Sequence, residues 1–491
     1  MTKKSITRNF IFNTILTMSS FIFPLISFPY VSRVLMADGL GRVTFASSII
    51  DYALTFAMLG MPLYGVKVCA GYIKNKEKLS QTVRELLVIN LLVGFLVMLL
   101  LATMVIIIPR FRQEWQLIII TSSTIPLNII GIEWLYKALE DYSYISIRTL
   151  TFKILGFLLM FLVVRTKDDY MVYAAITVLA SHGSFILNFF RSRTFLLENI
   201  SQRLNLKQHI KPLLILFFLS VSWTIYKNTD VVMMGFLTSD TEIGYYSTAL
   251  KIRSIVLSVV TSLGTVVLPR LVKYYKEGKY NEAKYNEAKK ILNKSSSFIM
   301  LSSLYFIGYI VINAREIILF IAGRNYLGAI PTLQVSIFSA IFVGYSIMYG
   351  TNILVSIGKE NVTIQASIIG VVLNICLNFI MIPKFAALGA GIATSIGEAV
   401  MVLYEIIYLG KDGWSYFERL NILKIIVVFI FSTFMLYIMK DFFVGYPLFI
   451  YIVISGVIYS IIYIFGLMIL RENLLSSWKI SILNRFNIIK E

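Results

Sequence analysis

The chain has 491 residues, of which 58% are hydrophobic and 14% are charged, and its mean hydropathy is +0.79. This balance excludes a soluble globular protein and predicts an all-α polytopic membrane protein. The net charge of +19 is typical of basic cytoplasmic loops, so we expect no nucleic-acid partner.

Fourteen apolar segments, each of a length that suits a bilayer core about 30 Å thick, follow one another along the chain. We predict transmembrane spans at 9–34, 40–66, 85–108, 115–139, 147–165, 171–191, 211–236, 243–269, 295–314, 326–356, 362–382, 388–409, 424–439 and 448–470. An even number of spans places both termini on one side of the membrane. The connections on that side carry most of the Lys and Arg residues, with the densest run at 270–294. The positive-inside rule therefore predicts that both termini are cytoplasmic.

Weak internal similarity divides these spans into two lobes. Residues 41–46, at the start of the second span, resemble residues 244–249, at the start of the eighth, and each span is second in a block of six. We predict two six-helix lobes in parallel repeat, followed by two C-terminal helices; such repeats place substrate sites at the interface between lobes. The predicted parts are an N-lobe at 1–191, a cytoplasmic linker at 192–210, a C-lobe at 211–409, and spans thirteen and fourteen with a cytoplasmic tail at 410–491.

Charged residues lie inside several spans, where an ion in hydrocarbon costs a few kcal/mol or more. Lys227 and Asp230 share one face of the seventh span, because they are three residues apart on a helix. Lys251 and Arg253 in the eighth span and Asp51 in the second lie at similar depths. These residues predict a polar cluster in the outer half of the membrane, contributed by both lobes. The alternative is a set of structural ion pairs, in which Lys227 and Asp230 neutralise each other.

A second polar group is predicted in the inner half of the membrane. Glu133, Lys137 and Glu140 are spaced to share one face of the fourth span. Arg148 and Lys153, at the start of the fifth span, complete this group. A Glu four residues before a Lys is the favourable orientation for a helical ion pair, so a structural salt-bridge network is the alternative to a functional role.

Two further sets of titratable residues lie within spans. Glu398 and Glu405, seven residues apart on one face of the twelfth span, are a candidate proton or cation site. His182 in the sixth span is interpreted as a packing histidine rather than a proton relay. The sequence contains no Walker loop, H-E-x-x-H or G-x-S-x-G motif, so we expect neither an enzyme nor a bound cofactor or metal.

Three segments resemble a known family. Residues 28–49 (FPYVSRVLMADGLGRVTFASSI), 133–148 and 227–252 are similar to segments of bacterial polysaccharide flippases in the multidrug/oligosaccharidyl-lipid/polysaccharide exporter superfamily. The number of spans and the short outer loops match as well, so the resemblance covers nearly the whole chain. Lys137 is a departure, since Gln is common at this position in that family.

The resemblance implies a function and a set of partners. Members of the family flip an oligosaccharide repeat unit, linked to undecaprenyl pyrophosphate, from the inner to the outer leaflet of the bacterial plasma membrane. The glycan would belong to capsule, exopolysaccharide, O-antigen or teichoic acid. Membrane lipids and other envelope-glycan assembly proteins are the expected partners beside this substrate. The two lobes would rock between inward-open and outward-open states.

The resemblance also implies a cationic cavity that binds the pyrophosphate through charge-assisted hydrogen bonds. The expected head-group residues are Arg33, Lys227, Lys251 and Arg253. Arg33 is included because of the similarity to lipid II-type flippases, and an interfacial Arg is the alternative. Entry of H⁺ or Na⁺ at an acidic residue would let the membrane potential drive transport. The candidates for that role are Asp51, Asp230 and Glu398.

Two other functions compete with flipping. An exporter of small cationic drugs with the same fold, coupled to H⁺ or Na⁺, would need an acidic or aromatic cavity, whereas Lys227, Lys251 and Arg253 are cationic. A membrane-bound glycan polymerase or ligase would need a large outer loop with catalytic Arg or His, which the predicted topology lacks.

Overall fold

The computed structural model describes residues 6–197, 203–278, 282–443 and 445–476. Every secondary-structure element in these ranges is a helix, which confirms the predicted all-α class. The middle of the predicted linker, at 198–202, and the ends of the predicted cytoplasmic termini, at 1–5 and 477–491, lie outside the described residues.

The chain forms two compact units, Met1–Gly244 and Tyr245–Glu491. The first contains α1 (Ile6–Met58), α2 (Met61–Gly71), α3 (Lys76–Ile107), α4 (Pro109–Gln113), α5 (Trp115–Ser122), α6 (Thr124–Gly131), α7 (Glu133–Ala138), α8 (Tyr142–Val163), η1 (Lys167–Asp169), α9 (Tyr170–Val178), η2 (Leu179–Gly183), α10 (Phe185–Ser192) and α11 (Lys207–Leu237). The division falls inside α12 (Asp240–Val260).

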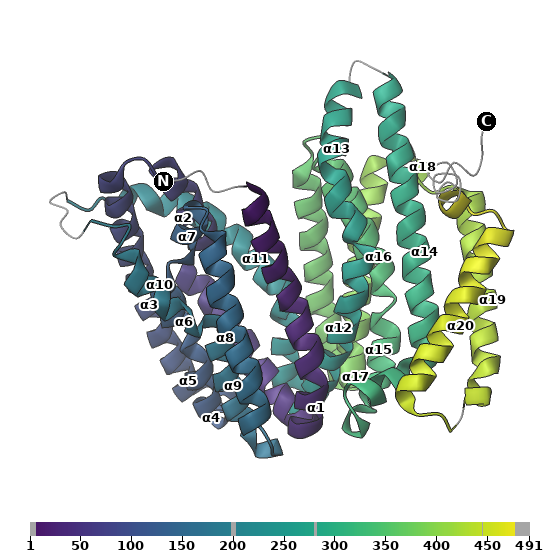
Figure 1. The fold of residues 1–491 in the computed structure, drawn as a ribbon, viewed down its shortest axis with the longest axis horizontal. Helices are drawn as coiled ribbons and strands as arrows, with labels where there is room; N and C mark the ends of the chain where they lie inside the picture. Colours follow the sequence, from purple (N-terminus) through teal and green to yellow (C-terminus); the bar gives the residue numbers. More distant parts are fainter. Residues whose placement is uncertain (1–5, 198–202, 279–281, 444, 477–491) are drawn as a thin grey trace. The chain divides into compact units, whose positions relative to one another are not determined.

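The second unit continues with α13 (Ser262–Gly278), α14 (Glu282–Ile321), η3 (Arg324–Tyr326), α15 (Ala329–Ser336), α16 (Ser339–Ser346), η4 (Ile347–Leu354), α17 (Glu360–Leu409), α18 (Lys411–Ser415), α19 (Arg419–Met439), η5 (Lys440–Phe443) and α20 (Leu448–Ile469). Within this unit α13 lies beside α14, and α19 lies beside α20 (Figure 1). Helix α17 packs against α15, α16 and η4.

Ten helices in the described part of the chain are long and apolar enough to cross a membrane. Two of them, Thr14–Gly71 and Glu360–Leu409, each contain two predicted spans. Non-helical backbone at Met36 (φ 57°) and Ala386 (φ 46°) separates those spans where the sequence predicts a connection. The fourth predicted span is instead broken into α5, α6 and α7, and the eighth into α12 and α13. The count of fourteen spans therefore stays a prediction.

Helix α11, the seventh predicted span, packs along α1 in the first unit. Polar contacts join the two helices, including Tyr52 Oη to Thr229 Oγ1 at 2.9 Å and Thr55 Oγ1 to Thr224 Oγ1 at 2.8 Å. Small and hydroxylated residues bring membrane helices together in this way, because there is little hydrophobic gain from association in lipid. The compact units divide after α11, between Gly244 and Tyr245, whereas the predicted lobes divide at the linker 192–210. The two six-helix lobes were inferred from the internal repeat, and they stay a prediction.

The core of the first unit gathers around α2, α3 and α7. Met61, Leu86, Leu135 and Tyr136 are fully buried there. Gly65 lies against the indole of Trp134, so close that a β-carbon at this position would be 2.6 Å from the ring. This packing anchors α7, which carries part of the predicted inner-half polar group.

Candidate functional site

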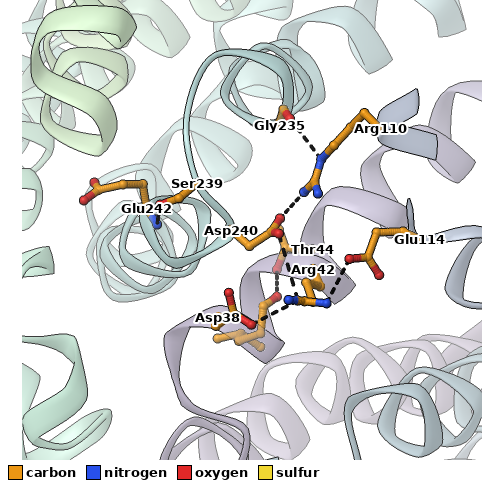
Figure 2. A network of polar contacts seen from close by, with 10 residues as sticks. Asp38, Arg42, Thr44, Arg110, Glu114, Gly235, Ser239, Asp240 and Glu242 are labelled. Carbon is orange, nitrogen blue, oxygen red and sulfur yellow. Dashed lines mark hydrogen bonds and ion pairs between the residues drawn. The ribbon is translucent and has the colours of Figure 1, made fainter. Parts of the chain in front are cut away.

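A charged network joins three connections at one end of the first unit (Figure 2). Arg42 of α1 pairs with Asp38 at 3.0 Å, with Glu114 at 3.1 Å and with Asp240 at 4.0 Å. Arg110 also pairs with Asp240, and its Nε donates to the Gly235 carbonyl at 3.1 Å. All three connections are predicted to be outer loops. We call Asp38, Arg42, Arg110, Glu114 and Asp240 the Arg42 network.

A close backbone approach brings this network together. A β-carbon on Gly41 would overlap the Asp240 carbonyl, and one on Gly244 would overlap the Ala37 carbonyl. Only glycine lets the start of α12 reach α1 at these points. These are the two glycines whose surroundings suggested the internal repeat. The sequence analysis did not single out Arg42 and Arg110, because nothing in their spacing identifies Asp240 as a partner.

Lys227 of α11 pairs with Asp51 of α1 at 3.1 Å, and the side chains are 65% and 42% exposed. Asn228 Nδ2 also donates to Asp51 at 3.4 Å. The proposed neutralisation of Lys227 by Asp230 is not the pairing that the structure contains. Asp230 is buried on the same helix, with only 8% of its surface exposed. The neighbouring helix, rather than the helix's own next turn, supplies the carboxylate.

Arg253 of α12 pairs with Glu398 of α17 in the second unit, at 2.5 Å. Here the side chains are only 8% and 3% exposed. Lys251, two residues earlier, is half-buried, as expected for residues that point to different sides of a helix. Arg33 lies exposed on α1, where its Nη1 donates to the Pro29 carbonyl at 2.6 Å.

The predicted head-group and coupling residues are thus divided between the two units. Those of the first unit are Arg33, Asp51, Lys227 and Asp230, and those of the second are Lys251, Arg253 and Glu398. Lys227 pairs with Asp51 and Arg253 pairs with Glu398, so each of these two predicted cations contacts a predicted coupling residue. The roles of all these residues stay predictions.

The inner-half group is smaller than predicted. Glu133 pairs with Lys137 at 2.8 Å and with Arg148 at 3.3 Å. Glu140 is exposed and does not join them, because α7 ends at Ala138 and Glu140 has a left-handed φ of 53°. Lys153 donates instead to Ser19 and Ser20 of α1, at 3.1 and 2.8 Å. The expectation of one helical face was wrong, since the helix does not continue far enough to maintain it.

A buried cluster that the sequence analysis missed ties the start of α11 to α2 and α3. Tyr64 Oη lies 2.9 Å from His209 Nδ1, and His209 Nε2 lies 2.8 Å from Glu85 Oε2. Glu85 Oε1 accepts the backbone N–H of Asn205 at 2.8 Å. The three side chains are between 1% and 8% exposed. The available signal was Glu85, an acidic residue at the edge of an apolar run. Its partners Asn205 and His209 are about 120 residues away in sequence, so the sequence did not identify them.

The second unit also has an apolar groove of about 640 Å³ between α14 and α20. Tyr305, Tyr309, Val457 and Phe465 are among its lining residues. The tyrosine hydroxyls bond within the protein, Tyr305 with Ser460 at 2.6 Å and Tyr309 with the Ile452 carbonyl at 2.7 Å. Aromatic and aliphatic carbon therefore makes up most of the groove surface.

The fold defines a class of membrane proteins. The structure is similar to that of the lipid II flippase MurJ in an inward closed conformation, with a TM-score of 0.71 over 95% of this chain and 100% of that one. The sequences are 17% identical, so this likeness concerns the fold.

The sequence comparisons identify the family. Residues 6–275 match the model of the polysaccharide biosynthesis protein family, and the chain belongs to that family. It is 19% identical to a putative O-antigen transporter of Escherichia coli K12, over 84% of this chain and 98% of that protein. It is 23% identical to the probable low-salt glycan biosynthesis flippase Agl15 of Haloferax volcanii, over 39% of each chain. The predicted resemblance to polysaccharide flippases is thereby confirmed.

Proposed function

We propose that the protein flips lipid-linked oligosaccharides across the bacterial plasma membrane by alternating access. Family membership over residues 6–275 is the observation that carries the proposal. Support comes from a relative named as a putative O-antigen transporter, which aligns with this chain over 98% of its own length. The polar residues inside the predicted spans and the apolar groove suit a ligand with an anionic head and a hydrocarbon tail.

The ion pairs suggest how a pyrophosphate would be bound. Lys227 and Asp51 are both partly exposed, and such a pair is worth no more than about 1 kcal/mol where it faces a water-filled transport cavity. A doubly charged head group could therefore take Lys227 from Asp51 at small cost, leaving the carboxylate hydrated. Arg253 is held in a buried pair with Glu398, and breaking that pair costs more. We assign Lys227 to initial head-group binding in the first unit and Arg253 to a later step of the cycle, and Lys251 stays a separate head-group candidate of the second unit.

The groove between α14 and α20 would accept the polyprenyl tail. Most of its lining side chains are aliphatic or aromatic, and the hydroxyl of Ser460 is bonded to that of Tyr305. Such a surface lets the tail stay in a hydrocarbon environment while the glycan crosses. Capsule, O-antigen and teichoic-acid precursors share this head and tail, so each is a candidate cargo.

Depletion of the protein in its native host tests the proposal. We expect an undecaprenyl-linked oligosaccharide to accumulate in the cytoplasmic leaflet, and mass spectrometry of that lipid would identify the glycan. Wild type should rescue, whereas Lys227→Ala and Lys251→Ala should rescue at least tenfold less well at equal protein level. Lys411→Ala, an exposed cation of α18, is the matched control and should rescue fully. Increased sensitivity to cationic dyes without lipid accumulation would contradict flipping and favour the drug exporter.

A further inference from the structure

Glu405 of α17 is a buried carboxyl group with no role in the transport steps proposed above. Its side chain is completely buried, with 0% of the residue exposed. Neither Oε1 nor Oε2 has a hydrogen-bond partner among the described residues, and no ion pair forms there. Asp51 and Glu398, two of the three predicted coupling carboxylates, each face a cation instead.

A local distortion of the neighbouring helix makes room for this carboxyl. Residues Ile347–Leu354 form the π-helix η4, and π-helical turns inside longer helices are frequent at functional sites. A β-carbon on Gly350 of η4 would lie 2.5 Å from Glu405 Oε1. Thr363 stands beside Gly350, but its hydroxyl donates to the Gly350 carbonyl at 3.4 Å rather than to Glu405. Glycine at position 350 is thus what allows the carboxyl to enter.

Charged neighbours do not compensate for the burial of Glu405. The titratable groups of the elements packed on this part of α17 are Tyr345 of α16, Tyr349 of η4, and Lys411 and Asp412 of α18. Tyr349 donates to the Gly413 carbonyl at 2.8 Å, and Tyr345 bonds with Ser296 at 3.2 Å. None of these groups makes a hydrogen bond or ion pair with Glu405 in the described part of the chain.

We propose that Glu405 is a proton-binding site, neutral in the conformation described here and deprotonated when η4 separates from α17. An isolated carboxylate in a low-dielectric interior is strongly disfavoured, and protonation removes the charge. Sodium would need several oxygen ligands, whereas Glu405 belongs to no group of three or more His, Cys, Asp or Glu side chains that could hold a metal ion among the described residues. The site therefore suits H⁺ rather than Na⁺.

The position of Glu405 connects the proton to transport. It lies four residues before the end of α17 at Leu409, or about 6 Å along the helix axis, at a predicted cytoplasmic end. Movement of η4 would admit water, and the carboxyl would then transfer its proton to that water and become a hydrated carboxylate. Repacking would require a proton to return. This inference rests on the proposed alternating access, since it links one conformational step to proton exchange.

The protonation state is testable without any transport assay. We expect purified wild type at neutral pH to show an infrared band of a protonated carboxyl that Glu405→Gln lacks. Glu360→Gln, at the exposed first turn of the same helix, should keep the band. Dicyclohexylcarbodiimide, which reacts with protonated carboxyls in apolar surroundings, should label Glu405, less at higher pH and equally with or without Na⁺. The absence of the band in wild type, or protection of Glu405 by Na⁺, would overturn the proposal.

The link to transport is tested in proteoliposomes that contain the lipid-linked oligosaccharide isolated from depleted cells. Wild-type flipping should change several-fold when a pH gradient is imposed, whereas Glu405→Gln should flip at a rate that ignores the gradient. Glu360→Gln should behave as wild type. An equal response of wild type and Glu405→Gln would overturn the coupling but leave the flippase function intact. Failure of wild type to flip would contradict the proposed function, and the infrared band would still decide the state of Glu405.

Discussion

The ion pairs Lys227–Asp51 and Arg253–Glu398 have similar chemistry but very different surroundings. Each joins a basic and an acidic residue from neighbouring helices within predicted spans. The first pair is largely exposed, at 65% and 42%, and the second is almost completely buried, at 8% and 3%. Water can compensate for much of the electrostatic free energy that is lost when the exposed pair separates, whereas little water reaches the buried pair. The exposed Lys227–Asp51 pair is therefore suited to exchange partners with a ligand, and the buried Arg253–Glu398 pair is suited to hold helices together.

The largest expected effect comes from removing one member of the buried pair. Glu398→Ala should remove the carboxylate that pairs with the buried Arg253 and lower the free energy of unfolding by about 3–5 kcal/mol. Thermal unfolding in detergent measures this change, with Asp51→Ala as the matched variant in the exposed pair. Equal losses of stability in the two variants would show that burial does not distinguish the pairs.

In the inner-half group, the carboxylate of Glu133 pairs with one exposed and one buried cation. The Arg148 side chain is 1% exposed and that of Lys137 is 44% exposed, and both pair with Glu133. Arg148→Ala should therefore lower the free energy of unfolding by about 1–3 kcal/mol, through lost packing and a less satisfied, half-buried Glu133 carboxylate. Lys137→Ala should cost less than about 1 kcal/mol. A larger loss for Lys137→Ala in the same unfolding experiment would reverse the comparison.

The exposed pair should matter for transport more than for stability. Lys227→Ala should change the free energy of unfolding by less than about 1 kcal/mol. Its flipping rate in proteoliposomes should nevertheless fall about tenfold, which corresponds to roughly 1.4 kcal/mol of lost transition-state stabilisation. The exchanged pair Lys227→Asp with Asp51→Lys keeps the ion pair, so it should unfold like wild type. Recovery of the full flipping rate in this double variant would show that only the pairing matters.

The smallest expected effect is the dependence of the stability loss on ionic strength. Raising salt from 0.1 to 1 M shortens the Debye length from about 10 to about 3 Å and screens exposed charges. The small destabilisation by Asp51→Ala should therefore disappear at high salt, while that by Glu398→Ala should persist. Thermal unfolding at the two salt concentrations measures both, and a salt-sensitive Glu398→Ala effect would indicate that water reaches Arg253.

The sequence predicted well what depends on neighbours along one helix. Apolar runs of membrane length specified the helices, and the breaks at Met36 and Ala386 fall where connections were expected. The Glu133–Lys137 ion pair followed from a spacing of four residues. The prediction for Glu140 failed because it assumed a continuous helix, and the backbone leaves the helical conformation after Ala138.

Only the tertiary structure decided which charges meet between helices. Lys227 could pair with Asp230 on its own helix, yet it pairs with Asp51 of α1. Helical periodicity specifies the face on which a side chain lies, but the rotation and depth of the neighbouring helix decide its partner. Glu405 illustrates the same limit, because its spacing from Glu398 suggested a shared role on one face. Packing gives Glu398 an arginine and leaves Glu405 against the backbone of a π-helix, where charge cannot be compensated.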